Sequence, residues 1–489
     1  MSRSHTFFVF FILLILPALV FAEDKKVIIG FHQNSGLTDH DKNERVRRAG
    51  GRIKRDHTRI NAISAQLPEE AIAGLKRDPR IKYIEEDRVI SFDEPPPTQI
   101  TPPADYADSW SIVHIGADVA AMNGIKGAGV KVAILDSGID YNHPDLKDNY
   151  KGGYNFAYDN NDPFDDTRLG HGTHVAGIIA AKDNGTGVVG VAPDASLYAV
   201  KVLNGGMMGS TSDILSGIEW AITNKMDIIN MSFGVPFDPL NYSQAVEDAC
   251  QQAYDAGIII IAAAGNSNQP TVDYPAAFDS VIAVSATAMD DSRAPFSNYG
   301  TKVELAAPGT DIKSTIPGGS YAVISGTSQA APHVAGVAAL LLSAGIKDGN
   351  ADGNIVDDVR KRLDSTAHDL GDPGRDVYFG FGLVDAPRGL EEAAKHYTLS
   401  RTRAPLKADA LTMPLKPGSH RIGIINHGLK NIVFRAPHYT EVVELEKHHQ
   451  RHLDDHEGSF EFTSENAGSI TAYPHGEIGA FADITISNN

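Results

Sequence analysis

The stretch Val130-Lys-Val-Ala-Ile-Leu-Asp136-Ser-Gly-Ile-Asp140 joins a continuous apolar run to a carboxylate and then to a glycine-containing turn. A continuous apolar run of this length is typical of a strand that is buried on both faces of a parallel sheet. Similar runs recur at 196–202, 227–231, 258–263 and 281–284, and segments with helical patterns separate them. This alternation predicts an α/β domain with a doubly wound parallel sheet.

Two more segments place a reactive side chain among glycines and small residues. They are Gly170-His171-Gly-Thr-His174 and Gly326-Thr-Ser328-Gln-Ala-Ala, and each opens a helical pattern. A serine hydroxyl becomes an effective nucleophile when a histidine accepts its proton, and a carboxylate must hold that histidine in the right tautomer. Asp136, His171 and Ser328 supply these three groups in the order Asp, His, Ser, which is one of three known chain orders for such a triad.

These segments closely resemble those of the subtilisin-like serine proteases. The resemblance also rests on Ala262-Ala-Ala-Gly-Asn266 and on Gly190-Val-Ala-Pro193, which leads into Leu197-Tyr-Ala-Val-Lys-Val-Leu203. It runs from about Trp110 to about Ala394 and implies the α/β subtilisin-like fold. It also implies hydrolysis of peptide bonds through an acyl-enzyme, with Asn266 stabilising the oxyanion next to Ser328.

The resemblance further implies a substrate peptide that binds as an added strand. Two segments match those that flank the peptide in the family: Met207, Met208 and Gly209, and Ser232, Phe233 and Gly234. No acidic residue stands where it would meet a basic substrate side chain, because Ser267 follows Asn266. We therefore expect a broad specificity with apolar or aromatic side chains preferred before the scissile bond.

A structural calcium ion is the implied cofactor. A protein with the single cysteine Cys250 has no internal disulfide, and calcium takes oxygen ligands that lie close in sequence. The first site matches the family by position: Asp145, Lys182, Asn184, Thr186 and Val188, the lysine, threonine and valine through their carbonyls. A second candidate, at Asp348, Asn350 and Asp352, resembles the start of an EF-hand loop but has Val359 where that loop needs an acid.

The N-terminal region predicts export and self-control. Phe7 to Val20 is almost wholly apolar, and we interpret residues 1–22 as a signal peptide. Residues 23–104 alternate strand and helix patterns, which indicates a small ferredoxin-like α+β prodomain followed by a proline-rich linker. This region resembles the inhibitory propeptide of the family, which would serve as intramolecular inhibitor and chaperone, and we expect cleavage between Ser91 and Asp105.

The remaining boundaries follow from changes of pattern. We expect the catalytic domain at 105–396 and a C-terminal β-rich domain at 397–489, where short alternating runs replace the helical pattern. The C-terminal histidines show no ligand spacing. With a net charge of −19, the chain is an unsuitable partner for nucleic acid. We expect a secreted monomer that stays off the membrane after signal removal and takes proteins and peptides as substrates.

The same residues allow three other interpretations. His171 and His174 form a His-x-x-His pair, but no glutamate base or third ligand accompanies it, so we assign His174 to packing. A non-catalytic binding module would have no need to keep all four residues of the predicted catalytic site, which are Asp136, His171, Ser328 and Asn266. A dinucleotide site fails because Gly127 and Gly129 precede the strand, whereas a phosphate loop must follow one.

Overall fold

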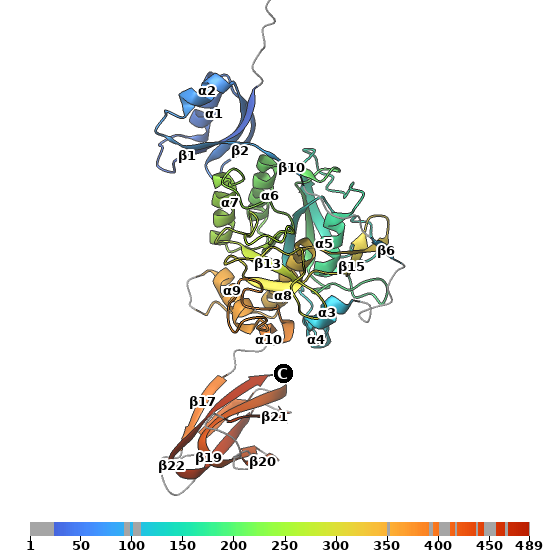
Figure 1. Cartoon of the computed structure of the whole chain (residues 1–489), viewed down its shortest axis with the longest axis vertical. Helices are drawn as coiled ribbons and strands as arrows, with labels where there is room; N and C mark the ends of the chain where they lie inside the picture. The colour runs from blue at the N-terminus through green and yellow to red at the C-terminus, as the bar shows by residue number, and fades with distance from the viewer. Residues whose placement is uncertain are drawn as a thin grey trace, which may run out of the picture. The chain divides into compact units, whose positions relative to one another are not determined.

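The computed structural model (Figure 1) describes residues 24–91, 98–100, 109–349, 353–390, 395–400, 411–415, 418–436, 439–444, 456–464 and 468–488. Side chains are described in 24–91, 109–349 and 353–390. The predicted signal peptide and most of the predicted linker lie outside the described residues. Contacts divide the chain into two compact units, Met1–Val384 and Asp385–Asn489.

A seven-stranded sheet forms the centre of the first unit, with the order β14-β13-β12-β11-β7-β9-β8 and parallel pairing throughout. Its strands are β7 (Lys131–Asp136), β8 (Tyr150–Asn155), β9 (Ser196–Lys201), β11 (Ile228–Met231), β12 (Ile259–Ala263), β13 (Ile282–Thr287) and β14 (Leu305–Pro308). The predicted α/β parallel sheet is confirmed. The edge strands β8 and β14 were not predicted, because an edge strand such as Tyr-Lys-Gly-Gly-Tyr-Asn lacks the continuous apolar run.

Helices cover both faces of this sheet (Figure 1). The helices α5 (His171–Ala180) and α8 (Thr327–Ser343) contact each other, and so do α6 (Thr211–Thr223) and α7 (Gln244–Asp255). α5 is buried along its whole length and α8 along most of its length, since both helices consist mainly of small and apolar residues. Along the described part of the chain, no helix has the length and apolar character that a bilayer crossing requires.

Shorter elements complete this unit. They are α3 (Trp110–His114), α4 (Ala117–Met122), β10 (Met208–Ser210), β15 (Ile312–Ile316), β16 (Ser320–Ile324) and α9 (Ile355–Thr366). The hairpin of β15 and β16 carries a third antiparallel strand, β6 (Thr98–Ile100), along β16.

Residues 24–91 form an N-terminal subdomain with its own core. Its elements are β1 (Lys25–Phe31), α1 (Asp39–Arg48), β2 (Arg52–His57), β3 (Ala62–Leu67), α2 (Glu69–Leu75) and β4 (Ile81–Glu86), and its antiparallel sheet has the order β2-β3-β1-β4. Successive residues of β1 serve two cores. Val27 and Ile29 pack beneath α1 and α2, whereas Ile28 belongs to the large cluster that contains residues of α6 and α7.

Two carboxylates of this subdomain cap the helices on which it packs. Asp87 accepts hydrogen bonds from the backbone N–H of Ser212 (2.9 Å) and from its hydroxyl (2.7 Å), in the first turn of α6. Glu85 accepts from the N–H of Gln244 (3.0 Å), the first residue of α7. Because the first N–H groups of a helix have no partner inside it and carry partial positive charge, each carboxylate stabilises the helix that it caps.

The second unit contains α10 (Ala386–Leu390) and an antiparallel sheet. The strands are β17 (Lys395–Ser400), β18 (Leu411–Leu415), β19 (Gly418–Ala436), β20 (Tyr439–Glu444), β21 (His456–Ser464) and β22 (Gly468–Asn488). β22 pairs with β17, β18 and β19, and β19 pairs also with β20 and β21. The domain boundaries at 104/105 and 396/397 stay predictions.

A buried group of charges ties α9 to the start of β14. The Arg360 guanidinium donates to both carboxylate oxygens of Glu304, and its Nε lies 2.6 Å from Glu304 Oε1. It also donates to the carbonyl of Asp279 at 2.7 Å. Asp364, one turn further along α9, is half-buried beside them. Burial, with the negative charge of Glu304, raises the pKa of Asp364 to about 8.

We therefore predict that stability depends on the protonation of Asp364. Its pKa is higher in the folded chain than in the unfolded one, so its stabilising contribution is complete below about pH 4 and declines as the pH approaches 8. Asp364→Asn should melt at the wild-type temperature near pH 5 and at a higher temperature near pH 9. Thermal melts across this range measure the difference. The exposed Asp372→Asn is the control, and a constant difference at all pH values would contradict the prediction.

Candidate active site

Asp136 and His171 meet at the carboxyl end of the sheet. Asp136 is the last residue of β7 and His171 the first of α5, and His171 Nδ1 lies 2.7 Å from Asp136 Oδ1. Both side chains are at most 1% exposed. A buried carboxylate requires a hydrogen-bonded partner. The imidazole therefore donates from Nδ1, which directs its other nitrogen, Nε2, away from the carboxylate.

Glycines make this close approach possible. A Cβ at Gly172 would lie 2.2 Å from the carbonyl oxygen of Gly138 and 3.1 Å from the Asp136 Cβ. Gly170, the N-cap of α5, has a φ of +66° and would meet the ring of Pro317 at 2.1 Å. The glycines that flank His171 in the sequence thus allow the helix start to touch the strand end.

Ser328 lies in the first turn of α8, with an unusual partner for its carbonyl group. In a regular helix this carbonyl would accept from the N–H of residue 332, but Pro332 has no N–H. The hydroxyl of Ser232 donates to it instead at 2.8 Å, and Asn230 Nδ2 donates to that hydroxyl at 2.8 Å. Ser232 therefore holds the backbone of the nucleophile, a role that the sequence did not suggest.

The amide of Asn266 is oriented by Thr327. Asn266 Oδ1 accepts from the backbone N–H of Thr327 (2.8 Å) and from its hydroxyl (2.9 Å), and the same hydroxyl accepts from the N–H of Gly265 (3.1 Å). With its oxygen engaged, Asn266 presents Nδ2 as a donor on the other side. Thr327 is a residue that sequence reasoning missed, although its place directly before Ser328 could have drawn attention to it.

Three polar atoms gather around Gly326. A Cβ built on this residue would lie 2.8 Å from Ser328 Oγ, 2.7 Å from Gln329 Oε1 and 3.5 Å from Asn266 Nδ2. Ser328 Oγ and Gln329 Oε1 are 3.2 Å apart. Only glycine leaves this space open, so the nucleophile and the amide donor border one small volume where a reacting carbonyl can sit.

The histidine that follows on α8 stays neutral. His333 is fully buried and its Nδ1 donates to the carbonyl of Gln329 at 2.8 Å. Burial lowers the pKa of His333 to about 4. His174 on α5 is also buried, and its Nε2 lies 3.1 Å from the Ile312 carbonyl and 3.3 Å from that of Ala322. Both rings serve packing and backbone hydrogen bonds.

Strand β10 is the edge to which a chain segment binds. It pairs with β5 (Val89–Ser91) in antiparallel register, with Met208 opposite Ser91, Gly209 opposite Ile90 and Ser210 opposite Val89. Met207, just before β10, is buried and has a φ of +56°. Met208 and Gly209 thus already pair with an added strand from the N-terminal subdomain, whereas Met207 lies outside this register.

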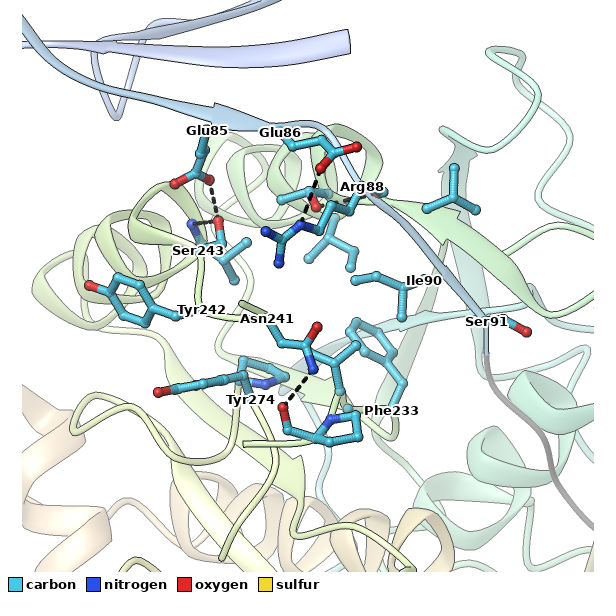
Figure 2. Close-up of a pocket in the computed structure, with 18 of the residues that line it drawn as sticks. Glu85, Glu86, Arg88, Ile90, Ser91, Phe233, Asn241, Tyr242, Ser243 and Tyr274 are labelled. Carbon is cyan, nitrogen blue, oxygen red and sulfur yellow. Dashed lines mark hydrogen bonds and ion pairs between the residues drawn. The ribbon is translucent and has the colours of Figure 1, made fainter. Parts of the chain in front are cut away.

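Ile90 points into a cavity of about 220 Å³ next to this edge (Figure 2). Apolar walls come from Ile214, Phe233, Val246, Tyr274 and Phe278, and Gly234 also borders the cavity. Of the segment 232–234, Phe233 and Gly234 therefore face the added strand, while the hydroxyl of Ser232 faces the backbone of the nucleophile. As substrate-binding residues the two segments stay predictions.

Asp145 gathers the loop that follows α5. Its carboxylate is buried and accepts from Asn184 Nδ2 (3.0 Å), the N–H of Val188 (3.2 Å) and the Tyr321 hydroxyl (2.9 Å). The N–H of Lys182 donates to the Asp145 carbonyl at 2.8 Å. The loop 182–188 therefore closes around Asp145. The carbonyl and amide oxygen atoms of the loop come from a short stretch of chain beside this carboxylate.

The second calcium candidate is described only in part. Asp348 accepts from the N–H of Gly353 at 2.7 Å, and Asn350 and Asp352 lie outside the described residues. Within the described part of the chain, no three His, Cys, Asp or Glu side chains come together as a metal-sized cluster. The neighbours of Asp145 are amide and carbonyl groups, which do not count toward a cluster of His, Cys, Asp and Glu side chains.

The chain is similar to known proteins over most of its length. A model described as the subtilase family matches residues 127–382. The chain is 43% identical over 369 residues to subtilisin NAT of Bacillus subtilis subsp. natto and to subtilisin E of Bacillus subtilis strain 168, covering 74% of this chain and 89% of each relative. It is 42% identical over 327 residues to M-protease of Shouchella clausii, covering 67% of this chain and 78% of the relative.

The arrangement predicts a large loss of turnover when Asn266 is replaced. Asn266→Ala should lower kcat for a peptide amide about 100- to 1000-fold with little change in KM, because the donor acts on charge that develops only in the transition state. Steady-state kinetics measure both constants. The neighbouring exposed Ser267→Ala is the control, and an Asn266→Ala enzyme with wild-type kcat would refute the assignment.

Proposed function

Because the chain belongs to the subtilase family and is a serine endopeptidase, we propose that it is a secreted protease that processes itself from a zymogen. Two contacts support the catalytic assignment: His171 with Asp136, and Ser328 and Asn266 around Gly326. In this assignment His171 accepts the Ser328 proton through Nε2 as the hydroxyl attacks the peptide carbonyl, and then returns it to the leaving amine.

Each neighbouring group has a defined part in this mechanism. Asp136 holds the imidazole and stabilises its charged form. Asn266 Nδ2 and the N–H of Ser328, at the positive end of α8, would donate to the oxyanion. The Ser232 hydroxyl holds the Ser328 carbonyl, which keeps the first turn of α8 in place while the reaction proceeds.

We assign the N-terminal subdomain as the inhibitory propeptide. Its sheet order β2-β3-β1-β4 is that of a ferredoxin-like domain, and its Glu85 and Asp87 cap α7 and α6. Its strand β5 occupies β10, the edge that a substrate strand needs. A segment that binds as a substrate would, and that also stabilises two helices of the protease, fits both an inhibitor and a folding aid.

A basic stretch of the subdomain adds to this binding. Arg55 donates to Asp213 (2.7 Å), Lys54 donates to Ser212 (2.8 Å), and His57 lies 3.0 Å from Glu219. Charge-assisted hydrogen bonds of this kind orient two surfaces relative to each other.

Export to the outside of the cell, removal of a signal peptide at 1–22 and a monomeric state belong to the same proposal.

The proposed specificity is broad, with apolar or aromatic side chains preferred before the scissile bond. The apolar cavity that receives Ile90 supports this preference, because a side chain at the same position of a substrate strand would meet the apolar walls around Phe233. A long apolar contact along an extended peptide suits cleavage of unfolded protein segments.

We also propose that calcium stabilises the fold at the first predicted site. Its oxygen atoms would come from Asp145 and Asn184 side chains and from the carbonyls of Lys182, Thr186 and Val188. The fit rests on the buried Asp145 carboxylate and the loop that closes on it. Calcium prefers such mixed carboxylate, amide and carbonyl oxygens, and it would tie β16, through Tyr321, to this loop.

Ser328→Ala tests the proposed function. We expect the variant to fold, to leave a peptide library uncut and to keep its N-terminal subdomain covalently attached, because both reactions need the same hydroxyl. Intact mass and N-terminal sequencing follow the processing, and library sequencing gives the cleavage preference of the wild type.

Ser325→Ala is the matched control, since it removes a hydroxyl three residues earlier. Full removal of the N-terminal subdomain from Ser328→Ala would refute self-cleavage. Cleavage of the peptide library by this variant at the wild-type rate would refute the catalytic role of Ser328. Cleavage restricted to bonds after Lys or Arg would refute the proposed specificity.

Calcium removal should lower the melting temperature. A ligand present at a thousand times its Kd stabilises a fold by about 4 kcal/mol, so an excess of chelator should lower the melting temperature by roughly 5–15 °C. Differential scanning calorimetry with and without chelator measures this. Asp145→Asn should melt early and respond little to chelator, whereas Asp348→Asn should respond as the wild type does. An unchanged wild-type melt would refute the site.

A further inference from the structure

A second buried carboxylate lies beside the Asp136–His171 pair, and the catalytic assignment does not use it. Asp165, in the loop before α5, is 1% exposed. Its Oδ1 accepts from the Ser137 hydroxyl (3.1 Å) and from the hydroxyl (2.6 Å) and N–H (3.2 Å) of Thr167. Its Oδ2 accepts from the hydroxyl (2.7 Å) and N–H (3.0 Å) of Thr173.

Two backbone N–H groups and three hydroxyls donate to Asp165, a set that suits an ionised carboxylate. A protonated carboxyl group would require one of the three hydroxyls to accept instead of donate. Burial raises the pKa of Asp165 above its ordinary value, although the hydrogen bonds of Thr167 and Thr173 and the charge of Lys201 act in the opposite direction. A buried charge that is held by five donors is costly to replace and has one defined geometry.

The carboxylate bridges the two segments that carry the catalytic pair. Ser137 follows Asp136, and its N–H donates to Asp136 Oδ1 at 2.6 Å. The Ser137 hydroxyl, which donates to Asp165, accepts in turn from the N–H of Gly172, the residue after His171, at 2.9 Å. Thr173, held by the other oxygen of Asp165, follows Gly172. One side chain thus fixes the end of β7 relative to the start of α5.

A buried lysine supplies the balancing charge. Lys201, the last residue of β9, is fully buried, donates to the carbonyl of Ser137, and forms an ion pair of 2.8 Å with Asp166. Ser137 is therefore held at its hydroxyl, its N–H and its carbonyl. Apolar residues at 137, 165 and 201 would not provide these directional contacts.

We propose that Asp165 is a positioning residue for catalysis, which acts through Ser137 and Thr173 to hold the Asp136–His171 hydrogen bond in its reactive geometry. Its charge also favours the protonated His171 that forms during the reaction. A catalytic group displaced by about 1 Å can cost about 100-fold in rate, so the loss of this bridge should appear in kcat.

The pH dependence of His171 reflects several charges. They are Asp136 at the end of β7, Asp165 and Asp166 in the loop before α5, and Lys201 at the end of β9. The other titratable group is His174, one turn along α5, whose buried ring faces backbone carbonyls. Of these, Asp165 combines a negative charge with hydrogen bonds to the residues that flank the catalytic pair. Its removal should therefore make it easier for His171 to lose its proton.

The test compares the self-processed full-length wild type with Asp165→Asn. We expect kcat for a chromogenic peptide amide to fall about 10- to 100-fold with KM nearly constant. The acid limb of the kcat/KM profile should move to lower pH by roughly half a unit, since a negative charge near the imidazolium is gone. Rates are normalised to the active-site concentration, titrated with a phosphonyl fluoride.

Glu304→Gln is the matched control, because it removes a buried, hydrogen-bonded carboxylate elsewhere in the same unit. It should lower the melting temperature but leave kcat and the acid limb unchanged. A folded Asp165→Asn enzyme with wild-type kcat and an unmoved acid limb would overturn the proposal. Loss of activity in the wild type itself would instead refute the proposed function.

A second pair of variants keeps the proposal testable if Asp165→Asn does not fold. Ser137→Ala keeps the charge of Asp165 but removes the hydroxyl of the bridge, and Ser137→Thr keeps the hydroxyl. We expect a kcat loss of about 10-fold in the alanine variant and recovery to within about twofold of the wild type in the threonine variant. Equal, wild-type kcat values for both would overturn the proposal.

Discussion

The hydrogen bond of 2.7 Å between Asp136 and His171 constrains the surrounding structure, because two groups of this polarity are buried there without contact with bulk water. The carboxylate is stable in this position only if donors surround it, and the imidazole is useful only if its second nitrogen is directed toward the nucleophile. The glycines at 170 and 172, the donors of Ser137 and the second carboxylate at Asp165 all serve this requirement.

The nucleophile is held in a different way, through the backbone of α8. Pro332 removes the helical hydrogen bond that the Ser328 carbonyl would accept, and Ser232, from the end of β11, provides another. The same helix start is fixed to Asn266 through Thr327. A parallel sheet brings these segments together, because the carboxyl ends of its strands meet at one edge.

The N-terminal subdomain satisfies backbone groups of the neighbouring sheet edge and helix ends. It adds a strand to β10 and caps the N-termini of α6 and α7 with carboxylates. Both contacts satisfy backbone groups that would otherwise face water. In the proposed function, one short domain would thus cover the substrate edge and stabilise the helices beside it.

Much of this protein could be predicted from local patterns. Continuous apolar strands indicated the sheet, and glycine-padded reactive residues in the order Asp–His–Ser indicated the proposed catalytic residues, because burial and close approach restrict which amino acids can occupy these positions. The tertiary structure decided what depends on residues far apart in sequence. Local patterns did not predict the edge strands β8 and β14. They also did not predict the hydrogen bond from the Ser232 hydroxyl to the Ser328 carbonyl or the bridge from Asp165 to Ser137. Each is a hydrogen bond or strand pairing between distant segments, and the sequence around one partner carries no mark of the other.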